Sequence, residues 1–482
     1  MTNFYTNPLE DRYPSAQMKE IFLPRTRIVL WRKLWVALAK AQQKLGLSIT
    51  DGQIKQMEEN VQNIDFAAAA AFEERVKHDV MAHVHTFAAA APLAEPIIHL
   101  GATSCFVTDN SDLIIYKTAL ELILKKITLC IKHLRDFSVK HKSVPTLGFT
   151  HFQPAQLTTV GKRTTLWIQD LLMDFNQIKG ILDDFKLRGA KGATGTCASF
   201  LSLFDGDVKK VKSLENLVLE HMGFGQNFID IPNKTFAVCG QTYPRKFDFL
   251  LLSALSSVAQ SAHKAAEDLR LLMHLGEIEE PIAAAQIGSS AMPYKRNPVK
   301  SERICSIARF VMNLPTNAAQ TASTQWFERT LDDSANRRIV MPQAFLGLDA
   351  VLNLYITIAK GLVVNKKIIE KNVLSKLPYM ATENIIMECV KRGGDRQQLH
   401  EAIRVHSFEC VRAEKDGGQG DLIKKIKSDK LFALVKGDLD KIICPSNYIG
   451  MADIQVDDFI NFFIDPILKD FCFDQLQTDI KI

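Results

Sequence analysis

The chain has 482 residues, of which 47 % are hydrophobic and 23 % are charged, as in ordinary globular proteins. Its 59 basic and 54 acidic side chains leave a net charge of +5, an excess too small and dispersed to indicate nucleic-acid binding, although a small anionic ligand needs only a few cations. Nine cysteines, an odd number with no CxxC pair, argue for reduced thiols and against a disulfide framework or a zinc knuckle.

The N-terminal stretch MTNFYTNPLEDRYPS is polar and lacks an apolar core, so we expect no signal peptide. No stretch reaches about 18 uninterrupted apolar residues, so we also expect no transmembrane helix. These features, together with the reduced cysteines, predict a cytoplasmic protein.

Long gaps between prolines predict long helices, because the helix interior excludes proline. The gaps lie between Pro96 and Pro145, Pro154 and Pro232, and Pro244 and Pro281. In the first gap we expect Asn110 or Ser111 to cap a helix whose apolar residues recur every three or four positions. These residues are Leu113, Tyr116, Leu120, Ile123, Ile127, Ile131, Leu134 and Phe137.

The third gap is apolar on more than one helical face, which predicts a helix buried among other helices. A further helical pattern runs from about Met341 to Leu362. Strand signals are poor, since alternating β-branched runs bounded by turns are nearly absent. We therefore predict an all-α protein with a central bundle of long helices.

Composition and spacing divide the predicted protein into three helical domains. The N-terminal domain covers 1–104, the long-helix bundle with its polar loops covers 105–363, and the C-terminal domain covers 364–482. The glycine-containing segment 223–243 is expected to be a loop between two bundle helices.

Two polar clusters in the first part of the chain each have a structural and a functional interpretation. In KHDVMAHVH (77–85), His78 and His85 share a predicted helical face and His83 points elsewhere, and the spacing is not that of a zinc set. These histidines are structural polar groups or part of a site. GATSCFVTDN (101–110) is a plain helix N-terminus or a place where the same N–H groups bind a carboxylate or phosphate.

Four later clusters contain groups suited to catalysis or anion binding. In GFTHFQPAQLTTVGKR (148–163), His151 is expected in a loop before a long helix, as a catalytic group or a capping residue. RGAKGATGT (188–196) does not satisfy the P-loop pattern and is a flexible linker or a ligand loop. QWFERTLDDSANRR (325–338) forms surface salt bridges or an arginine-rich anion site. QIGSSAMPYKRNP (286–298) favours neither helix nor strand.

The segment GSSAMPYKRNP resembles the signature loop GSSxMPxKxNP of the fumarase/aspartase superfamily, whose members cleave C–N or C–O bonds and release fumarate. The chain also resembles the adenylosuccinate lyase branch, in its animal and fungal form, at KHDVMAHVH, HLGATSCFVTDN, THFQPAQ, KGATGT, GQTY, QWFERTLDDSANRR and MATENIIM. The resemblance spans about residues 8–470. It implies a homotetramer with a twenty-helix core, in which each active site is built from three subunits.

The resemblance implies a role for each matching residue. Ser289 matches the general base, His151 the general acid and Glu302 the carboxylate that orients this histidine. Lys295 and Asn297 match groups that hold the succinyl carboxylates. Further substrate contacts are Thr103, Ser104 and Gln241, and the nucleotide and phosphate contacts are Arg12, Tyr13, His78, Asp79, Arg303, Arg329, Ser334 and Arg338. Lys77 and Cys197 stand where the family usually has arginine and glutamine.

The implied reaction is an anti β-elimination that releases fumarate from adenylosuccinate, giving AMP, and from SAICAR, giving AICAR, in purine nucleotide biosynthesis. It needs a base for the carbon-bound proton, positive charge beside the carboxylate, and an acid for the leaving amine. No metal or organic cofactor is expected. The alternatives are a non-catalytic helical oligomer of the same fold, as crystallin relatives are, and another fumarate-releasing lyase such as argininosuccinate lyase.

Overall fold

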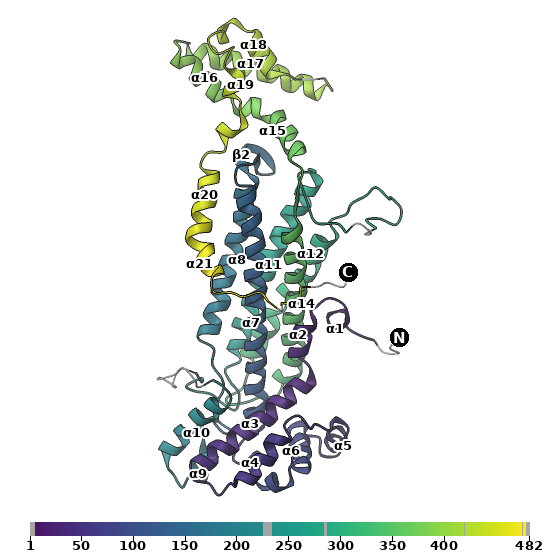
Figure 1. Ribbon diagram of the computed structural model, residues 1–482, viewed down its shortest axis with the longest axis vertical. Helices are drawn as coiled ribbons and strands as arrows, with labels where there is room; N and C mark the ends of the chain where they lie inside the picture. Colours follow the sequence, from purple (N-terminus) through teal and green to yellow (C-terminus); the bar gives the residue numbers. More distant parts are fainter. Residues whose placement is uncertain (1–4, 225–233, 284–286, 419, 475, 479–482) are drawn as a thin grey trace.

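The computed structural model describes residues 5–224, 234–283, 287–418, 420–474 and 476–478. Helices predominate, which confirms the predicted all-α class. The molecule is elongated, with long helices along its axis and smaller helical parts at both ends (Figure 1). Residues 225–233 of the predicted loop 223–243 lie outside the described part of the chain.

The central bundle contains the longest helices of the described chain. They are α7 (Ser104–Lys140), α8 (Val160–Asp183), α11 (Lys246–His274) and α14 (Asp333–Gly361), and the shorter α12 (Val299–Met312) and α13 (Pro315–Ser323) pack against α11. Their apolar faces form the largest hydrophobic core. All eight apolar positions predicted from Leu113 to Phe137 are buried. In α11 the consecutive Leu251 and Leu252 are both buried, as expected of a helix surrounded by others.

The predicted start of α7 at Asn110 or Ser111 is wrong. The helix begins at Ser104, after Thr103 as its N-cap, and both predicted caps lie buried inside it. Asn110 exchanges hydrogen bonds with the backbone of Gly189, and Ser111 Oγ accepts one from Trp31 Nε1 at 2.9 Å. These polar side chains sit inside a helix because distant parts of the chain satisfy them.

Helix α14 begins at Asp333, before the predicted start near Met341. Apolar periodicity misses the first two turns, because their buried residues, Asp333 and Arg337, are charged and ion-paired. The helix continues through Pro342, whose ring removes one backbone hydrogen bond. By length and composition alone α14 could cross a membrane, but 83 % of its most apolar window is buried inside the protein, as in a core helix.

Short strands accompany the helices. Strands β1 (Pro145–Thr150) and β2 (Gln153–Thr159) form an antiparallel hairpin whose register pairs Leu147 with Leu157, with an irregularity before Phe149. Strand β3 (Ile278–Glu279) pairs with β4 (Val363–Val364). The hairpin lies at the upper end of the bundle, immediately before α8 (Figure 1).

The N-terminal helices cover the lower end of the bundle (Figure 1). At this end lie α3 (Pro24–Lys44), α4 (Asp51–Glu59), α5 (Phe66–Val76), α6 (Asp79–Ala90) and η1 (Pro92–Ile97), joined by α9 (Ala198–Leu203) and α10 (Val208–His221), and preceded in the chain by α1 (Pro8–Asp11) and α2 (Ala16–Ile21). A second hydrophobic core, which includes the buried Trp31 and Trp35, holds α3, α4, α6, η1, α9 and α10 together with the start of α7. Helices α1 and α2 lie higher, against α14 and α7.

A third core holds the helices at the upper end of the molecule (Figure 1). They are α15 (Lys366–Met380), α16 (Thr382–Lys391), α17 (Arg396–Lys415), α18 (Leu422–Ser428), η3 (Lys430–Phe432), α19 (Leu439–Ile442) and η4 (Pro445–Tyr448). The chain then returns along the bundle in α20 (Ala452–Phe459), η5 (Ile460–Ile464) and α21 (Asp465–Leu468). There Val456, Ile460 and Ile464 join the central core, and Arg135 of α7 binds Asp465 at 2.9 Å.

Candidate active site

Several predicted contacts to the substrate and to its nucleotide lie where helices begin at the lower end of the bundle. Thr103 caps α7, Ser334 lies in the first turn of α14, and α6 begins at Asp79. Arg338 Nη2 binds Asp79 Oδ2 at 2.9 Å, which joins α14 to α6 across 259 positions of sequence. The fold therefore gathers helix N-termini and cations from distant segments, an arrangement suited to an anionic ligand.

Gln241 is fixed beside this group through its backbone. Its N–H donates to Glu328 O at 2.9 Å, and its carbonyl accepts from Arg188 Nε at 2.7 Å. Arg188 is fully buried and also donates through Nη2 to Gly192 O at 2.6 Å. The segment RGAKGATGT is thus held by the bond from Arg188 to Gln241 and by the bonds between Gly189 and Asn110, rather than left as a free linker.

Arg329 lies on the loop before α14 and points back to the buried Asp333. Its Nη1 donates to both carboxylate oxygens of Asp333 at 2.8 Å. Burial, with a contribution from Asp109, raises the pKa of Cys105 to about 11, while Arg329 acts in the opposite direction. The ion pairs Arg329–Asp333, Arg245–Asp333 and Arg245–Asp109 connect Arg329 to α7.

Arg12, Tyr13 and Arg303 form a second group, between the N-terminal segment and α12. Both guanidinium groups lie 5.7 Å from the centroid of the Tyr13 ring. Nη1 of Arg303 is buried and has no hydrogen-bond partner in the described part of the chain. Two cations beside one aromatic ring suit a ligand that carries both a flat base and a negative charge.

Ser289 lies on the loop that leaves the side of the bundle between β3 and α12 (Figure 1). Its Oγ accepts hydrogen bonds from the backbone N–H groups of Ala291, at 3.3 Å, and Met292, at 3.1 Å. Backbone N–H groups directed at one oxygen stabilise negative charge on it. The loop therefore favours the alkoxide form that a serine base requires.

The same loop is closed on itself by Asn297, whose Nδ2 donates to Gly288 O at 2.8 Å. A Cβ at Gly288 would lie 2.0 Å from the carbonyl oxygen of Lys295, so this close approach requires glycine. The Lys295 side chain is exposed. The serine, the lysine and the asparagine of the signature thus belong to one compact loop.

Glu302 lies exposed in the first turn of α12. The start of this helix is anchored by the buried Glu280, which accepts hydrogen bonds from the backbone N–H groups of Lys300 and Ser301 at 2.9 Å each. A carboxylate at a helix N-terminus satisfies free donors and complements the helix dipole. Glu280 therefore fixes the junction between the loop and α12.

His151 lies in the turn of the β1–β2 hairpin, not in a plain loop as predicted. His151 and Phe152 both have left-handed backbones, with φ of 53° and 58°, as the two central residues of a type I′ hairpin turn require. The histidine is exposed, and no hydrogen bond or ion pair between described residues joins it to Ser289 or Glu302. The three residues predicted as base, acid and orienting carboxylate thus lie on a loop, a hairpin turn and the first turn of α12.

The three histidines of KHDVMAHVH have separate environments. His78 is the N-cap of α6, accepting from Met81 N at 3.3 Å, so it does not share a helical face with His85 as predicted. His85 stacks on Phe72, with 4.3 Å between ring centroids. His83 is buried against Trp31, and this burial lowers its pKa. Only His78 adjoins the candidate site, through Asp79.

His99, the first residue of HLGATSCFVTDN, was given no role in the sequence analysis. Its Nδ1 accepts a hydrogen bond from Trp35 Nε1 at 2.9 Å. Burial, followed by the nearby His78, lowers the pKa of His99 to about 4. The residue type alone does not indicate this lowered pKa, because the pKa depends on burial and on His78, which only the fold brings near.

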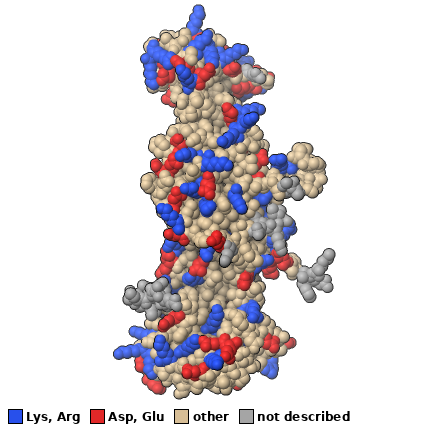
Figure 2. Space-filling view, in the orientation of Figure 1, with Lys and Arg blue, Asp and Glu red and all other residues tan. Residues whose placement is uncertain are grey.

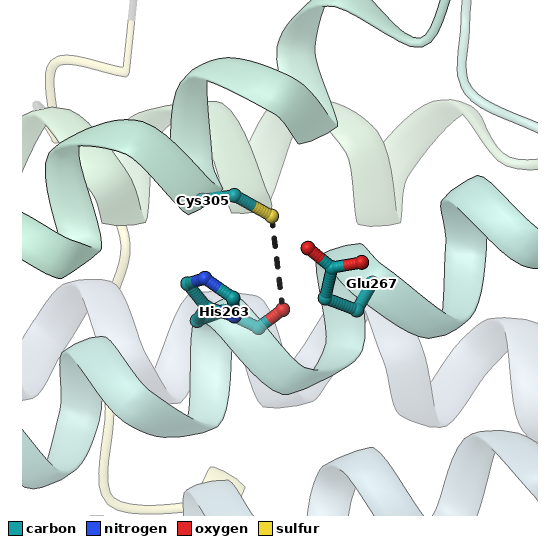
Figure 3. A group of neighbouring side chains, drawn as sticks. All are labelled: His263, Glu267 and Cys305. Atoms are coloured by element: carbon teal, nitrogen blue, oxygen red, sulfur yellow. Dashed lines mark hydrogen bonds between the residues drawn. The ribbon is translucent and has the colours of Figure 1, made fainter.

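A group of metal-ligating type lies outside the predicted site. The ligand atoms of His263, Glu267 and Cys305 lie within 4.8 Å of one another on α11 and α12 (Figure 3). Arg270 donates to Glu267 at 2.6 Å and to Cys305 Sγ at 3.9 Å, and burial raises the pKa of this thiol to about 11. A neighbouring cation and a disfavoured thiolate both oppose metal binding, so the group joins two helices.

On the face shown in Figure 2, basic and acidic side chains are interspersed along the molecule. This face therefore carries no continuous stripe of positive charge.

Comparison with known proteins identifies the family. A family model described as Lyase matches residues 11–313, and one described as Adenylosuccinate lyase C-terminus matches residues 378–459. Curated adenylosuccinate lyases from Schizosaccharomyces pombe and Saccharomyces cerevisiae are each 50 % identical over 471 residues, covering 97 % of this chain and 96 % of theirs. The adenylosuccinate lyase of Schistosoma mansoni is 46 % identical over 470 residues, with the same coverage. The 3-carboxy-cis,cis-muconate lactonizing enzyme from Pseudomonas putida shares the fold, with a TM-score of 0.80 at 22 % identity over 96 % of this chain and 100 % of that one. The chain belongs to the adenylosuccinate lyase family, whose members are C–N lyases.

Proposed function

We propose that this lyase acts in the cytoplasm as a homotetramer and releases fumarate by anti β-elimination, from adenylosuccinate to give AMP and from SAICAR to give AICAR. Ser289 removes the carbon-bound proton, and His151, oriented by Glu302, protonates the departing nitrogen. Both substrates present a succinyl-amine and a ribose phosphate, so one site serves both. The two hydrogen bonds that Ser289 Oγ accepts support its role as the base.

The charged and polar side chains of the candidate site fit the other steps of the elimination. Negative charge develops on the succinyl carboxylate as the proton leaves, and Lys295, six residues after Ser289 on the same compact loop, stabilises it. Asn297, Thr103, Ser104 and Gln241 hold the succinyl group. The nucleotide lies against the ring of Tyr13. Its phosphate is bound by four cations, Arg12, Arg303, Arg329 and Arg338. His78, Asp79 and Ser334 complete the site.

One observation carries the proposal of a shared site. Ser289, His151 and Glu302 lie on a projecting loop, a hairpin turn and the first turn of α12, and no hydrogen bond or ion pair between described residues connects them. Acid and base must both lie within hydrogen-bond reach of one substrate. Neighbouring copies of the chain therefore supply the missing partners, as in closed symmetric oligomers.

The chemical roles are tested with Ser289→Ala and His151→Ala. Each should lower turnover of adenylosuccinate by orders of magnitude, measured as the fall in substrate absorbance and the appearance of fumarate. Ser290→Ala, in the same loop but outside the assigned machinery, is the matched control and should retain turnover. Full activity of either active-site variant in an intact oligomer would remove the role assigned to that residue.

The sharing of sites is tested by mixing these two variants. If Ser289 and His151 of one site come from different chains, dissociation and random reassembly should restore both groups in about a quarter of the sites. If each site takes both residues from one chain, mixing restores none. A mixture that stays as inactive as its components, although labelled subunits exchange, would contradict the shared site.

A further inference from the structure

The orientation of Arg329 is set by the buried carboxylate of Asp333. Both hydrogen bonds to Asp333, at 2.8 Å, leave from the same nitrogen, Nη1. In the part of the chain that the structure describes, Nε and Nη2 of Arg329 have no hydrogen-bond partner. These two nitrogens form the edge of a guanidinium that binds an anion through two parallel bonds. The Arg329 side chain is 21 % exposed, so this edge is accessible.

Asp333 has the rigidity that such a support requires. Its side chain is fully buried, and Oδ2 also accepts from Arg245 Nε at 2.7 Å. Arg245 in turn binds Asp109 Oδ1 at 3.1 Å, and both of those side chains are 2 % exposed. The chain of alternating charges joins α14 to the start of α11 and to α7. Because it is anchored on long core helices, Asp333 has little freedom to follow a moving arginine.

We propose that Asp333 is a positioning residue for substrate binding, which holds Arg329 through Nη1 so that its Nε–Nη2 edge faces the phosphate of the nucleotide substrate. This inference rests on the proposed function and deepens it, because it names the residue that fixes a phosphate-binding cation. Asp333 itself touches no substrate. A preoriented cation loses less side-chain freedom on binding, so its contribution is to affinity.

The experiment is a double-mutant cycle of Asp333→Asn and Arg329→Gln in the full-length enzyme. Asp333→Asn should raise KM for adenylosuccinate and Ki for AMP by about tenfold, while kcat changes by less than about twofold, since the contact persists from ground state to transition state. Ki for fumarate, which has no phosphate, should stay unchanged. In the Arg329→Gln background, Asp333→Asn should add no further change in Ki for AMP.

Two controls separate positioning from folding. Asp248→Asn removes another buried carboxylate of the same region, which binds Arg337 Nε at 2.7 Å, and should leave Ki for AMP unchanged. Arg329→Lys keeps the charge and leaves the Arg245–Asp333 pair intact, but lysine lacks the two-nitrogen edge. It should raise Ki for AMP nearly as much as Arg329→Gln, and this readout does not depend on whether Asp333→Asn assembles.

The outcomes distinguish the positioning role of Asp333 from the phosphate-binding role of Arg329, on which it rests. An unchanged Ki for AMP in Arg329→Gln removes Arg329 from the phosphate site, and overturns both this inference and the role assigned to Arg329. A raised Ki in Arg329→Gln with an additive effect of Asp333→Asn overturns the positioning role alone. Arg329→Lys with the affinity of the unmodified enzyme also overturns it, because charge without orientation would then suffice.

Discussion

Replacing Lys126 with methionine should destabilise the folded protein, because it leaves a buried carboxylate without its cation. The side chains of Lys126 and Asp349 are both 0 % exposed, in the centre of the bundle. Nζ of Lys126 binds Asp349, Asn353 Oδ1 at 2.8 Å and Ser15 Oγ at 3.2 Å. Burial lowers the pKa of Lys126 and Asp349 opposes that shift, so each charge depends on the other.

The magnitude follows from this burial. Removing one member of a buried ion pair costs about 3–5 kcal/mol, because the remaining charge is left unpaired. At roughly 2 cal/mol/K per residue, the unfolding entropy of a chain of this length is on the order of 1 kcal/mol/K. The Tm of Lys126→Met should therefore fall by about 3–5 °C. Adding Asp349→Leu removes the unpaired charge, so the double variant should recover about half of that loss or more.

Differential scanning calorimetry at one scan rate and one protein concentration measures these shifts, since oligomers and large chains unfold in a rate- and concentration-dependent way. A Lys126→Met variant with an unchanged Tm would refute the reasoning. So would a double variant that loses as much as the two single variants together, because the two charges would then act independently.

Two further predictions concern other parts of the fold. Burial lowers the pKa of His99 from its ordinary value of 6.5 to about 4, so the unfolded state binds more protons between these pH values. Stability therefore falls as pH decreases from 6.5 towards 4, by up to ~1.4 kcal/mol per pH unit. His99→Asn keeps an acceptor for Trp35 and tolerates the φ of 68°, so Tm measured from pH 7 to 5 should fall less steeply; an equally steep fall would contradict this role. A Cβ at Gly161 would lie 2.3 Å from Ser138 O and 2.6 Å from Lys142 Cα, so Gly161→Ala should push α8 from α7 and cost about 1–3 kcal/mol in urea unfolding, whereas Gly180→Ala, with open space around it, should not.

Long helices and the reaction family could be predicted from the sequence, because both depend on local information. Proline gaps and apolar spacing in α7 and α11 record which residues face a core, whatever that core contains. The loop around Ser289 and Lys295 carries its chemistry within a few consecutive residues. Relatives 50 % identical over 97 % of the chain confirm the family that this loop indicated.

The start of α7, the environment of His151 and the supports of the site could not be predicted in this way. Ser111 is satisfied by Trp31, 80 positions away, and the pairs Asp109–Arg245 and Lys126–Asp349 join residues 136 and 223 positions apart. A polar residue is stable inside a helix only when such a partner arrives. The sequence by itself thus determined the helices and the chemistry of the loop, while tertiary structure alone decided which buried charges pair and how they orient the site.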